Sequence, residues 1–230
     1  MEKILFICEG STEIFLLYKI LEKEFKIKIS EELKENGNLS MKNIEDIMTN
    51  FAKTNNISIE IADLKGERNL VNYTKVLMNS RFFLDLTRII YIMDADYEEG
   101  TETGYERTEK AINDSVKKLK KESENLEFYY FITPNNKDDG MTETILLDAL
   151  KCQEIVTYIK EEVIPTVKEM EGCKITNKEK SAFMMVAATQ EPLRGTAPIF
   201  ISRSYDKLDK ESQSLKNLID FIGKCIKINE

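Results

Sequence analysis

The stretch Ile89–Asp96, IIYIMDAD, decides the fold, because five apolar residues lead directly into two aspartates spaced one apart. In a β-strand, residues two apart point to the same side. Asp94 and Asp96 are therefore expected to emerge together at the carboxyl end of a buried strand. Open α/β sheets hold their functional sites at that end.

An earlier stretch is built in the same order. Ile4–Glu13 reads ILFICEGSTE: an apolar run, an acid at Glu9, a glycine turn at Gly10, and then Ser11 or Thr12 as the cap of a helix. Right-handed crossover connections set such strands close together in one sheet. We therefore expect acids from both stretches to share a divalent metal at one edge of the sheet.

The remaining patterns predict an α/β fold with a parallel four-stranded sheet sandwiched by helices. The expected strands lie at 3–8, 57–64, 88–93 and 126–132, and the expected helices between them at 11–25, 70–79 and 105–121. The run 57–64 alternates apolar and polar residues, which is typical of a strand nearer the edge of a sheet. In the first helix the predicted apolar stripe consists of Phe15, Leu16, Tyr18, Ile20 and Leu21.

Two regions stand apart from this alternation. Residues 26–56 are polar and rich in Asn and Lys, and they predict an insertion with one short amphipathic helix at 41–53. After Met141 the pattern is helical, with a loop or flap predicted over Glu191–Asp206. The expected helices lie at 142–150, 152–171, 177–190 and 212–227. The sequence thus predicts an α/β core over 1–150 and an all-helical extension over 151–230, packed on the core.

Composition limits the chemistry. The chain has 230 residues, 42% of them hydrophobic, and a formal net charge of −8, which gives no positive evidence for a polyanionic partner. The absence of histidine excludes catalytic schemes that need an imidazole, as well as mixed Cys/His zinc sites. The four cysteines show no CxxC pairing and are expected to be reduced, mostly buried thiols. Without a signal peptide or a membrane-spanning run, a cytoplasmic location is expected.

The two acidic motifs together carry a resemblance to a known family. CEGSTE after the first strand, with MDAD after the third, resembles the Toprim domain of topoisomerases, bacterial primases, small RNA-maturing nucleases and the overcoming-lysogenization-defect nucleases. The resemblance covers about residues 1–150 and is strongest to stand-alone microbial Toprim-like proteins of the nuclease branch. The chain lacks a nearby domain with a tyrosine nucleophile, so strand passage is not implied.

The resemblance implies roles for particular residues. Glu9 would serve in general acid–base chemistry or metal binding, and Asp94 with Asp96 would hold Mg²⁺. In the nuclease branch a second acid follows the first, which would be Glu13. A Gly-x-x-Glu element after the fourth strand would be Gly140 and Glu143.

The chemistry also follows from the residue types. Mg²⁺ prefers oxygen ligands, and two ions could serve an in-line displacement at phosphorus, with Mn²⁺ as a substitute. Five carboxylates suffice for two ions: Glu9, Glu13, Asp94, Asp96 and Glu143. Substrate phosphate would then be contacted by residues of the glycine turns and the late loop, namely Gly10, Lys65, Gly66 and Arg194. Lys65 is also a candidate catalytic residue beside Glu9, because its charge could neutralise the phosphate.

Each candidate also has a purely structural interpretation. Aspartates are common in turns, which applies to Asp94 and Asp96. Acids are favoured in the first turn of a helix, which applies to Glu13 and Glu143. Lys65 could be a solvated turn lysine, as most surface lysines are.

Three functions remain open from the sequence. The leading hypothesis is a Mg²⁺-dependent phosphoryl-transfer enzyme, most specifically a nuclease acting on DNA or RNA. A rival is a non-catalytic module that binds metal and a nucleotide or nucleic acid and regulates a partner, which the acidic net charge favours. The third is a small-molecule phosphohydrolase or nucleotidyl transferase, because the same metal arrangement handles phosphates of many sizes.

Overall fold

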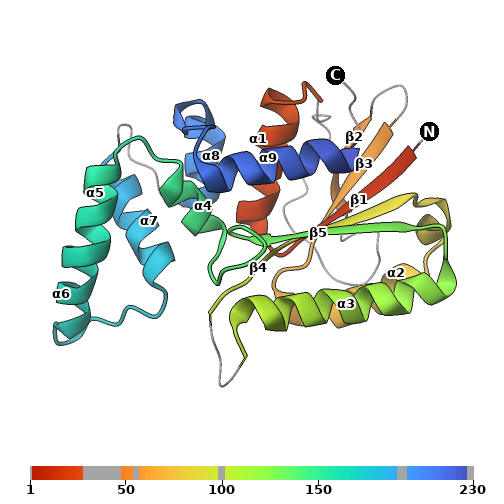
Figure 1. The fold of residues 1–230 in the computed structure, drawn as a ribbon, viewed down its shortest axis with the longest axis horizontal. Helices are drawn as coiled ribbons and strands as arrows, with labels where there is room; N and C mark the ends of the chain where they lie inside the picture. Colours follow the sequence, from red (N-terminus) through yellow and green to blue (C-terminus); the bar gives the residue numbers. More distant parts are fainter. Residues whose placement is uncertain (1, 28–47, 54–56, 98–101, 191–195, 227–230) are drawn as a thin grey trace.

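The computed structural model describes residues 2–27, 48–53, 57–97, 102–190 and 196–226, and shows an α/β fold built on one five-stranded sheet (Figure 1). The strand order is β2-β3-β1-β4-β5. The strands are β1 (Glu2–Cys8), β2 (Met48–Lys53), β3 (Ile57–Asp63), β4 (Arg88–Asp94) and β5 (Glu127–Thr133). Four strands, β3, β1, β4 and β5, are parallel, as predicted, and β2 joins β3 in antiparallel orientation.

The register of the parallel strands brings their carboxyl ends to one edge. Cys8 of β1 lies opposite Asp63 of β3 and Ile92 of β4, and Asp94 lies opposite Thr133 of β5. β1 and β4 are buried nearly throughout, because their continuous apolar runs are covered on both sides. The residues that follow these strands therefore meet at one place.

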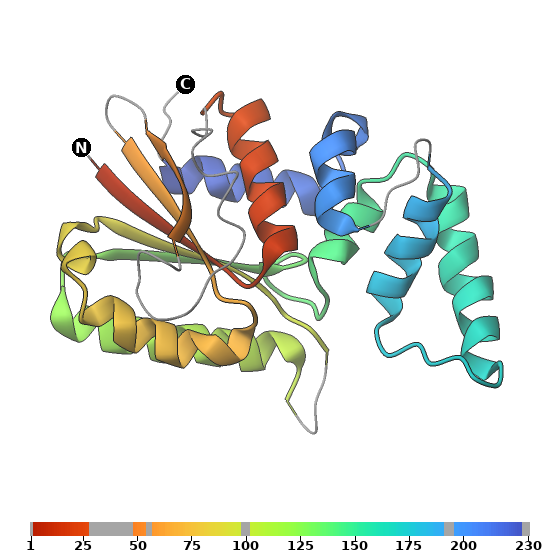
Figure 2. The same ribbon diagram turned by 180° about the vertical axis from the view of Figure 1, so that it is seen from behind.

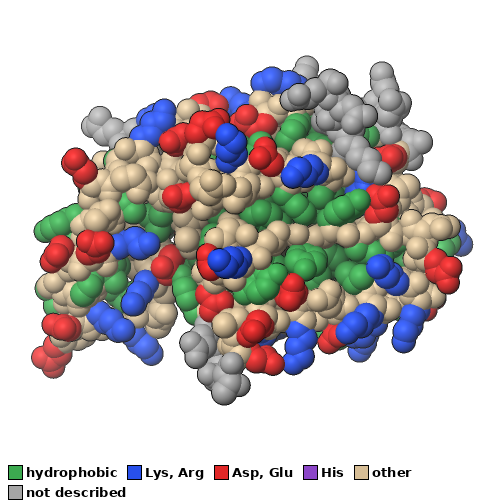
Figure 3. Space-filling view, in the orientation of Figure 1, with side chains coloured by type: hydrophobic (Ala, Val, Ile, Leu, Met, Phe, Trp, Pro, Cys, Tyr) green, Lys and Arg blue, Asp and Glu red, His purple; other side chains and the backbone are tan. Residues whose placement is uncertain are grey.

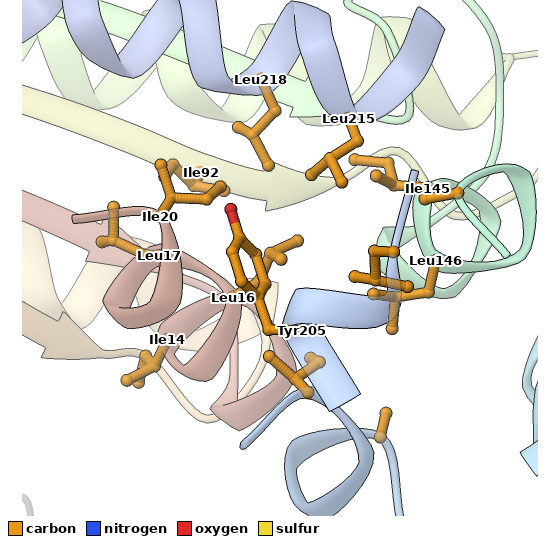
Figure 4. Packing of buried hydrophobic residues seen from close by; sticks show 14 of the residues in the cluster. Ile14, Leu16, Leu17, Ile20, Ile92, Ile145, Leu146, Tyr205, Leu215 and Leu218 are labelled. Carbon is orange, nitrogen blue, oxygen red and sulfur yellow. The ribbon is translucent and has the colours of Figure 1, made fainter. Parts of the chain in front are cut away.

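Helices cover both faces of the sheet (Figures 1 and 2). One face packs against α2 (Leu70–Met78) and α3 (Gly104–Glu122), through sheet residues such as Leu5 and Tyr91. The other face packs against α1 (Ser11–Lys23), α4 (Thr142–Asp148), α8 (Ala197–Ser204) and α9 (Gln213–Ile226). Figure 4 shows the second core, where Leu16 and Ile20 of α1 and Leu218 of α9 gather around Ile92.

The buried face of α1 agrees with the predicted stripe except at Phe15. Phe15 is 38% exposed, whereas Ile14 and Leu17 are buried beside Leu16 and Ile20. The predicted stripe is therefore confirmed at Leu16, Ile20 and Leu21, which are buried, and wrong at Phe15. Positions i, i+3 and i+4 still share a face, as an amphipathic helix requires.

The remaining helices form a lobe beside the sheet (Figure 1). The predicted helix at 152–171 consists of α5 (Gln153–Tyr158), a π-helical turn (Ile159–Val163) and α6 (Ile164–Glu169). Pro165 lies just after the wider turn and lacks the amide N–H that a regular helix uses there. α7 (Lys178–Ala188) lies beside α5 and α6 in the lobe (Figures 1 and 2). Short 3₁₀ turns complete the fold at Glu67–Asn69, Arg81–Asp85 and Tyr205–Lys207.

Two predicted elements were wrong. The helix expected at 41–53 is contradicted by β2, which pairs with β3. Because β2 is the edge strand on that side, β3 lies inside the five-stranded sheet and is the outermost of the four parallel strands. The loop expected over 191–206 contains α8, because Pro198 lies in the first turn of that helix, where its missing N–H is tolerated. Residues 28–47 and 191–195 lie outside the described part of the chain.

The surface seen in Figure 3 reflects these layers. Hydrophobic side chains lie on both sides of the backbone of β5, the edge strand that crosses the middle of this view, and Lys and Arg side chains gather over α3 below it. Cys8 and Cys225 are buried, Cys152 is half-buried, Cys173 is exposed, and all four thiols are free. Among the described helices, none is long and apolar enough to span a bilayer.

Candidate functional site

A pocket of about 350 Å³ opens at the carboxyl edge of the sheet. Its wall contains residues from the sheet, from the starts of α1 and α4, and from α7 in the lobe. The lining residues are Glu9, Gly10, Ser11, Thr12, Glu13, Asp63, Lys65, Gly66, Asp94, Glu143 and Lys180. Five carboxylates and two lysines therefore share one cavity.

Backbone hydrogen bonds set the first acid in position. The N–H of Glu9 donates to the carbonyl of Ile92 at 3.2 Å, and its own carbonyl accepts from the N–H of Gly66 at 2.9 Å. Gly66 has φ 111°, a conformation that glycine adopts without strain. The turn after β3 is thereby fixed against the residue that follows β1.

Glu9 and Asp94 meet directly. The carboxylate Oε2 of Glu9 accepts a hydrogen bond from the N–H of Asp94 at 3.1 Å, across 85 positions of sequence. The convergence expected from the two motifs is present, because β1 and β4 are adjacent parallel strands.

Asp94 is held rigidly through one of its oxygens. Oδ1 accepts hydrogen bonds from Thr133 Oγ1 at 2.7 Å, from the N–H of Thr142 at 2.9 Å and from Thr142 Oγ1 at 3.0 Å. The residue is only 6% exposed. All three donors use Oδ1, so within the described residues Oδ2 is the oxygen of Asp94 that can meet a ligand in the pocket that Asp94 lines.

Two buried glutamates complete the acidic wall. Glu13 and Glu143 are each 5% exposed. The N–H of Gly10 donates to Glu13 Oε2 at 2.8 Å, so this carboxylate turns back toward the start of α1. Glu143 Oε2 is buried without a hydrogen-bond partner among the described residues, which is an uncommon state for a buried carboxylate oxygen.

Asp96 has a different position from Asp94. It has φ 57°, and its backbone exchanges two 2.8 Å hydrogen bonds with Gly140. Gly140 has φ 148°, a conformation that favours glycine. Asp96 does not line the pocket, although its charge acts on Glu9 and Glu143.

The crowding of acids changes their protonation. Burial, and then the charges of Asp94 and Asp96, raise the pKa of Glu9 from 4.5 to about 8. Burial is also the main cause of the raised pKa values of Glu13, Asp94 and Glu143. Glu9 therefore retains its proton near neutral pH unless a cation compensates the charge.

The structure adds residues that the sequence analysis did not single out. Asp63 ends β3 as Asp94 ends β4, so the strand-end rule applied to Asp94 would have found it. Thr133 and Thr142 gave no signal of their own, and Lys180 lies in a helix with ordinary composition. Of the predicted phosphate contacts, Gly10, Lys65 and Gly66 line the pocket, whereas Arg194 lies outside the described residues.

The family follows from a match over nearly the whole chain. Residues 2–227 match the family described as "Protein of unknown function (DUF3226)". The chain belongs to this family. A crystal structure of a hypothetical protein from Pyrococcus horikoshii OT3 is similar to it, with a TM-score of 0.60 and 14% sequence identity, over 98% of this chain and 96% of that one. A search of curated proteins gives no match.

The similarity to the Pyrococcus protein shows a shared fold that includes the helical lobe of this DUF3226 chain, because it spans both chains almost completely. It carries no information on chemistry at this level of identity. The chemistry must be argued from the pocket.

The residues present fit a hard divalent cation in composition. Within the described ranges, no three acidic or cysteine side chains are already arranged to ligate one ion. Mg²⁺ needs only one or two protein carboxylates, with water and substrate oxygens as its other ligands. Glu9, Asp94 and the partnerless oxygen of Glu143 supply that donor set.

Proposed function

We propose that this protein is a Mg²⁺-dependent phosphoryl-transfer enzyme, specifically a nuclease acting on DNA or RNA in the cytoplasm. The observation that carries the proposal is the contact of Glu9 with Asp94 in a pocket that also contains Glu13 and Glu143. Acids from distant parts of the sequence have no structural reason to converge in a buried pocket, because their mutual repulsion opposes folding. A cation removes that cost.

The resemblance to Toprim domains supports the same proposal. The motifs that carry it are CEGSTE and MDAD, and in this fold they follow the adjacent strands β1 and β4. The Gly-x-x-Glu element is represented by Gly140 and Glu143, of which Glu143 lines the pocket. In this proposal Asp94 holds the metal together with Glu9 or Glu143, and Glu13 lies beside them.

The chain's own residues have distinct tasks in this scheme. A bound Mg²⁺ would supply Lewis-acid stabilisation of charge at the reacting phosphate. Without a cation, Glu9, whose pKa is about 8, is mostly protonated at neutral pH, so it can donate a proton as a general acid or lose that proton when it ligates the cation. Thr133 and Thr142 hold Asp94 in one orientation. Lys65 would contact a phosphate oxygen at the pocket mouth, where it lies exposed.

A cleavage assay with defined variants tests the proposal. We expect wild type to cleave single- or double-stranded nucleic acid with Mg²⁺ or Mn²⁺, Asp94→Asn to abolish cleavage, and Glu9→Gln to reduce it by about 10²–10⁴-fold. Asp114→Asn, at an exposed acid of α3, is the matched control and should cleave as wild type does. Unchanged cleavage by folded Asp94→Asn would reject the proposal.

The non-catalytic binding module remains a second candidate. This candidate is favoured by the net charge of −8 and by the presence of only two lysines among the pocket residues. A polyanionic substrate gains little long-range attraction from a protein with this charge. Metal-dependent binding of nucleotide or nucleic acid without product in the same assay would favour the module. Turnover of a mononucleotide alone would favour a small-molecule phosphohydrolase.

A further inference from the structure

We propose that Lys180, supplied by α7 of the helical lobe, is a phosphate-binding residue of the pocket and contacts an anionic phosphoryl group held opposite the carboxylates. This inference rests on the proposed function, because the carboxylates alone would repel a phosphate. In this inference the helical lobe contributes a ligand-binding residue to the pocket. The ligand is a phosphate group that binds together with a divalent cation.

The position of Lys180 is set by firm packing of its helix. The next turn of α7 buries Ala182, Phe183 and Val186. The Phe183 ring packs edge-on against Phe200 of α8, with centroids 5.2 Å apart. The first turn of α7 is therefore fixed relative to the core, and Lys180 enters the lining of the pocket from the lobe.

Lys180 is attracted by the carboxylates of the pocket but forms no ion pair with them among the described residues. The carboxylates that attract it are, in order of strength, Glu143, Asp94, Glu13 and Asp96. Within the described part of the chain, however, Lys180 forms no ion pair at 4.0 Å or less. Lys180, which is exposed, and the acidic residues thus line the same cavity from separate elements.

An anion with several oxygens fits this arrangement better than a neutral ligand. With all side chains ionised, the five carboxylates and two lysines of the pocket give a net charge of −3 (2 − 5). A divalent cation on the carboxylates reduces that excess, and a phosphate can then contact the cation on one side and Lys180 on the other. Lysine binds phosphate as a compact point charge and needs no fixed fork geometry.

The competing interpretation is that Lys180 only neutralises the carboxylates. The two interpretations differ in what removal of the charge does. A simple counter-ion would compete with the metal, so its removal would strengthen metal binding and leave phosphate binding unchanged. A phosphate ligand would leave metal binding intact or stronger and weaken phosphate binding.

The test measures two ligands separately on Lys180→Met, Lys180→Arg and the control Lys178→Met, which alters an exposed lysine of the same helical turn outside the pocket. Mn²⁺ alone is titrated by electron paramagnetic resonance, and inorganic phosphate is titrated by ³¹P NMR in saturating Mg²⁺. We expect Lys180→Met to weaken phosphate binding by about 10–100-fold, the range of a lost charge-assisted hydrogen bond. Lys180→Arg should recover part of the loss, and Lys178→Met should match wild type.

The outcomes separate this inference from the proposed function. If wild type binds Mn²⁺ but Lys180→Met binds phosphate as wild type does, the inference on Lys180 is overturned and the metal site stands. If wild type binds no Mn²⁺, the proposed function fails, and the inference that depends on it fails with it. Circular dichroism of each variant shows that the comparison is made on folded protein.

Discussion

Glu9 is the residue at which protons and metal are expected to compete. Its carboxylate accepts the N–H of Asp94 in a pocket where burial and neighbouring acids raise its pKa to about 8. A carboxylate ligates a metal only when deprotonated, so below that pH a metal must first displace the proton. Above it, no proton is bound at Glu9 and the competition ends.

We predict that Mn²⁺ affinity rises by roughly tenfold per pH unit, for each proton displaced, as the pH increases from about 6 toward 8. Above about pH 8 the affinity should level off. Glu9→Gln should weaken binding and remove most of this dependence. Calorimetric titrations in buffers of different ionisation enthalpy count the protons released. A flat affinity profile for wild type across this range would show that Glu9 does not take part in metal binding.

The threonines around Asp94 give a second prediction at this scale. Hydrogen bonds from Thr133 and Thr142 favour the charged form of Asp94 and lower its pKa against the opposing effect of burial. Thr133→Val or Thr142→Val should raise that pKa and weaken Mn²⁺ binding at pH 7 by about tenfold, for a loss of about 1.5 kcal/mol.

Thr108→Val is the matched control for both threonine variants. Its buried hydroxyl donates to the backbone carbonyl of Asp94 at 3.1 Å, not to the carboxylate. It should cost similar stability in urea unfolding and leave Mn²⁺ affinity near that of wild type. Equal loss of affinity in all three variants would contradict a specific effect on the carboxylate.

At the scale of elements, the sequence predicted the strands that carry the site. The runs before Glu9 and Asp94 are continuously apolar, and only a strand buried on both faces needs that pattern. The helix expected at 41–53 failed because its apolar spacing suits a helix, whereas pairing with β3 is a tertiary effect that no local pattern shows. Lys180 could not be predicted for the same reason, since α7 reaches the pocket only through packing.

The junction of β4 with α3 gives a prediction about backbone approach. A Cβ built on Gly104 would lie 2.3 Å from the carbonyl oxygen of Ala95, so no side chain fits without moving the start of α3. Gly104→Ala should lower the free energy of unfolding by about 1–3 kcal/mol.

Gly172→Ala provides the comparison for Gly104→Ala, because its Cβ would meet no atom within 4 Å although φ is 82°. Its cost should be about 1 kcal/mol, from backbone strain alone. Urea unfolding of both variants measures the difference. Equal costs would show that the approach of Gly104 to Ala95 is not a close constraint on the fold.

At the scale of the whole molecule, the pocket and the hydrogen bonds of Arg88 lie at opposite ends of the parallel strands. Arg88, 2% exposed at the start of β4, donates to Glu127 Oε2 at 2.8 Å and to the carbonyl of Cys225 at the end of α9 at 2.6 Å. It thereby ties the last helix to the edge away from the pocket. The core around α1, α4, α8 and α9 also includes side chains of α5 and α7, so the lobe and the sheet share one buried cluster.

We predict that Arg88→Met lowers the free energy of unfolding by about 2 kcal/mol, through the loss of hydrogen bonds to a charged group. Since Arg88 is far from the pocket along β4, Mn²⁺ affinity of the folded variant should stay near that of wild type. Chemical denaturation and metal titration on the same sample measure both. A large fall in Mn²⁺ affinity with an unchanged free energy of unfolding would contradict this separation of the Arg88 contacts from the pocket.

The most direct test of the central claim, that acids from distant parts of the chain bind one shared cation, is an anomalous difference map from crystals soaked in Mn²⁺. We predict a peak in the pocket at ligand distance from a carboxylate oxygen of Asp94 and from Glu9 or Glu143, and its loss in Asp94→Asn crystals. A map without density in the pocket, or with Mn²⁺ only at surface acids, would contradict the claim.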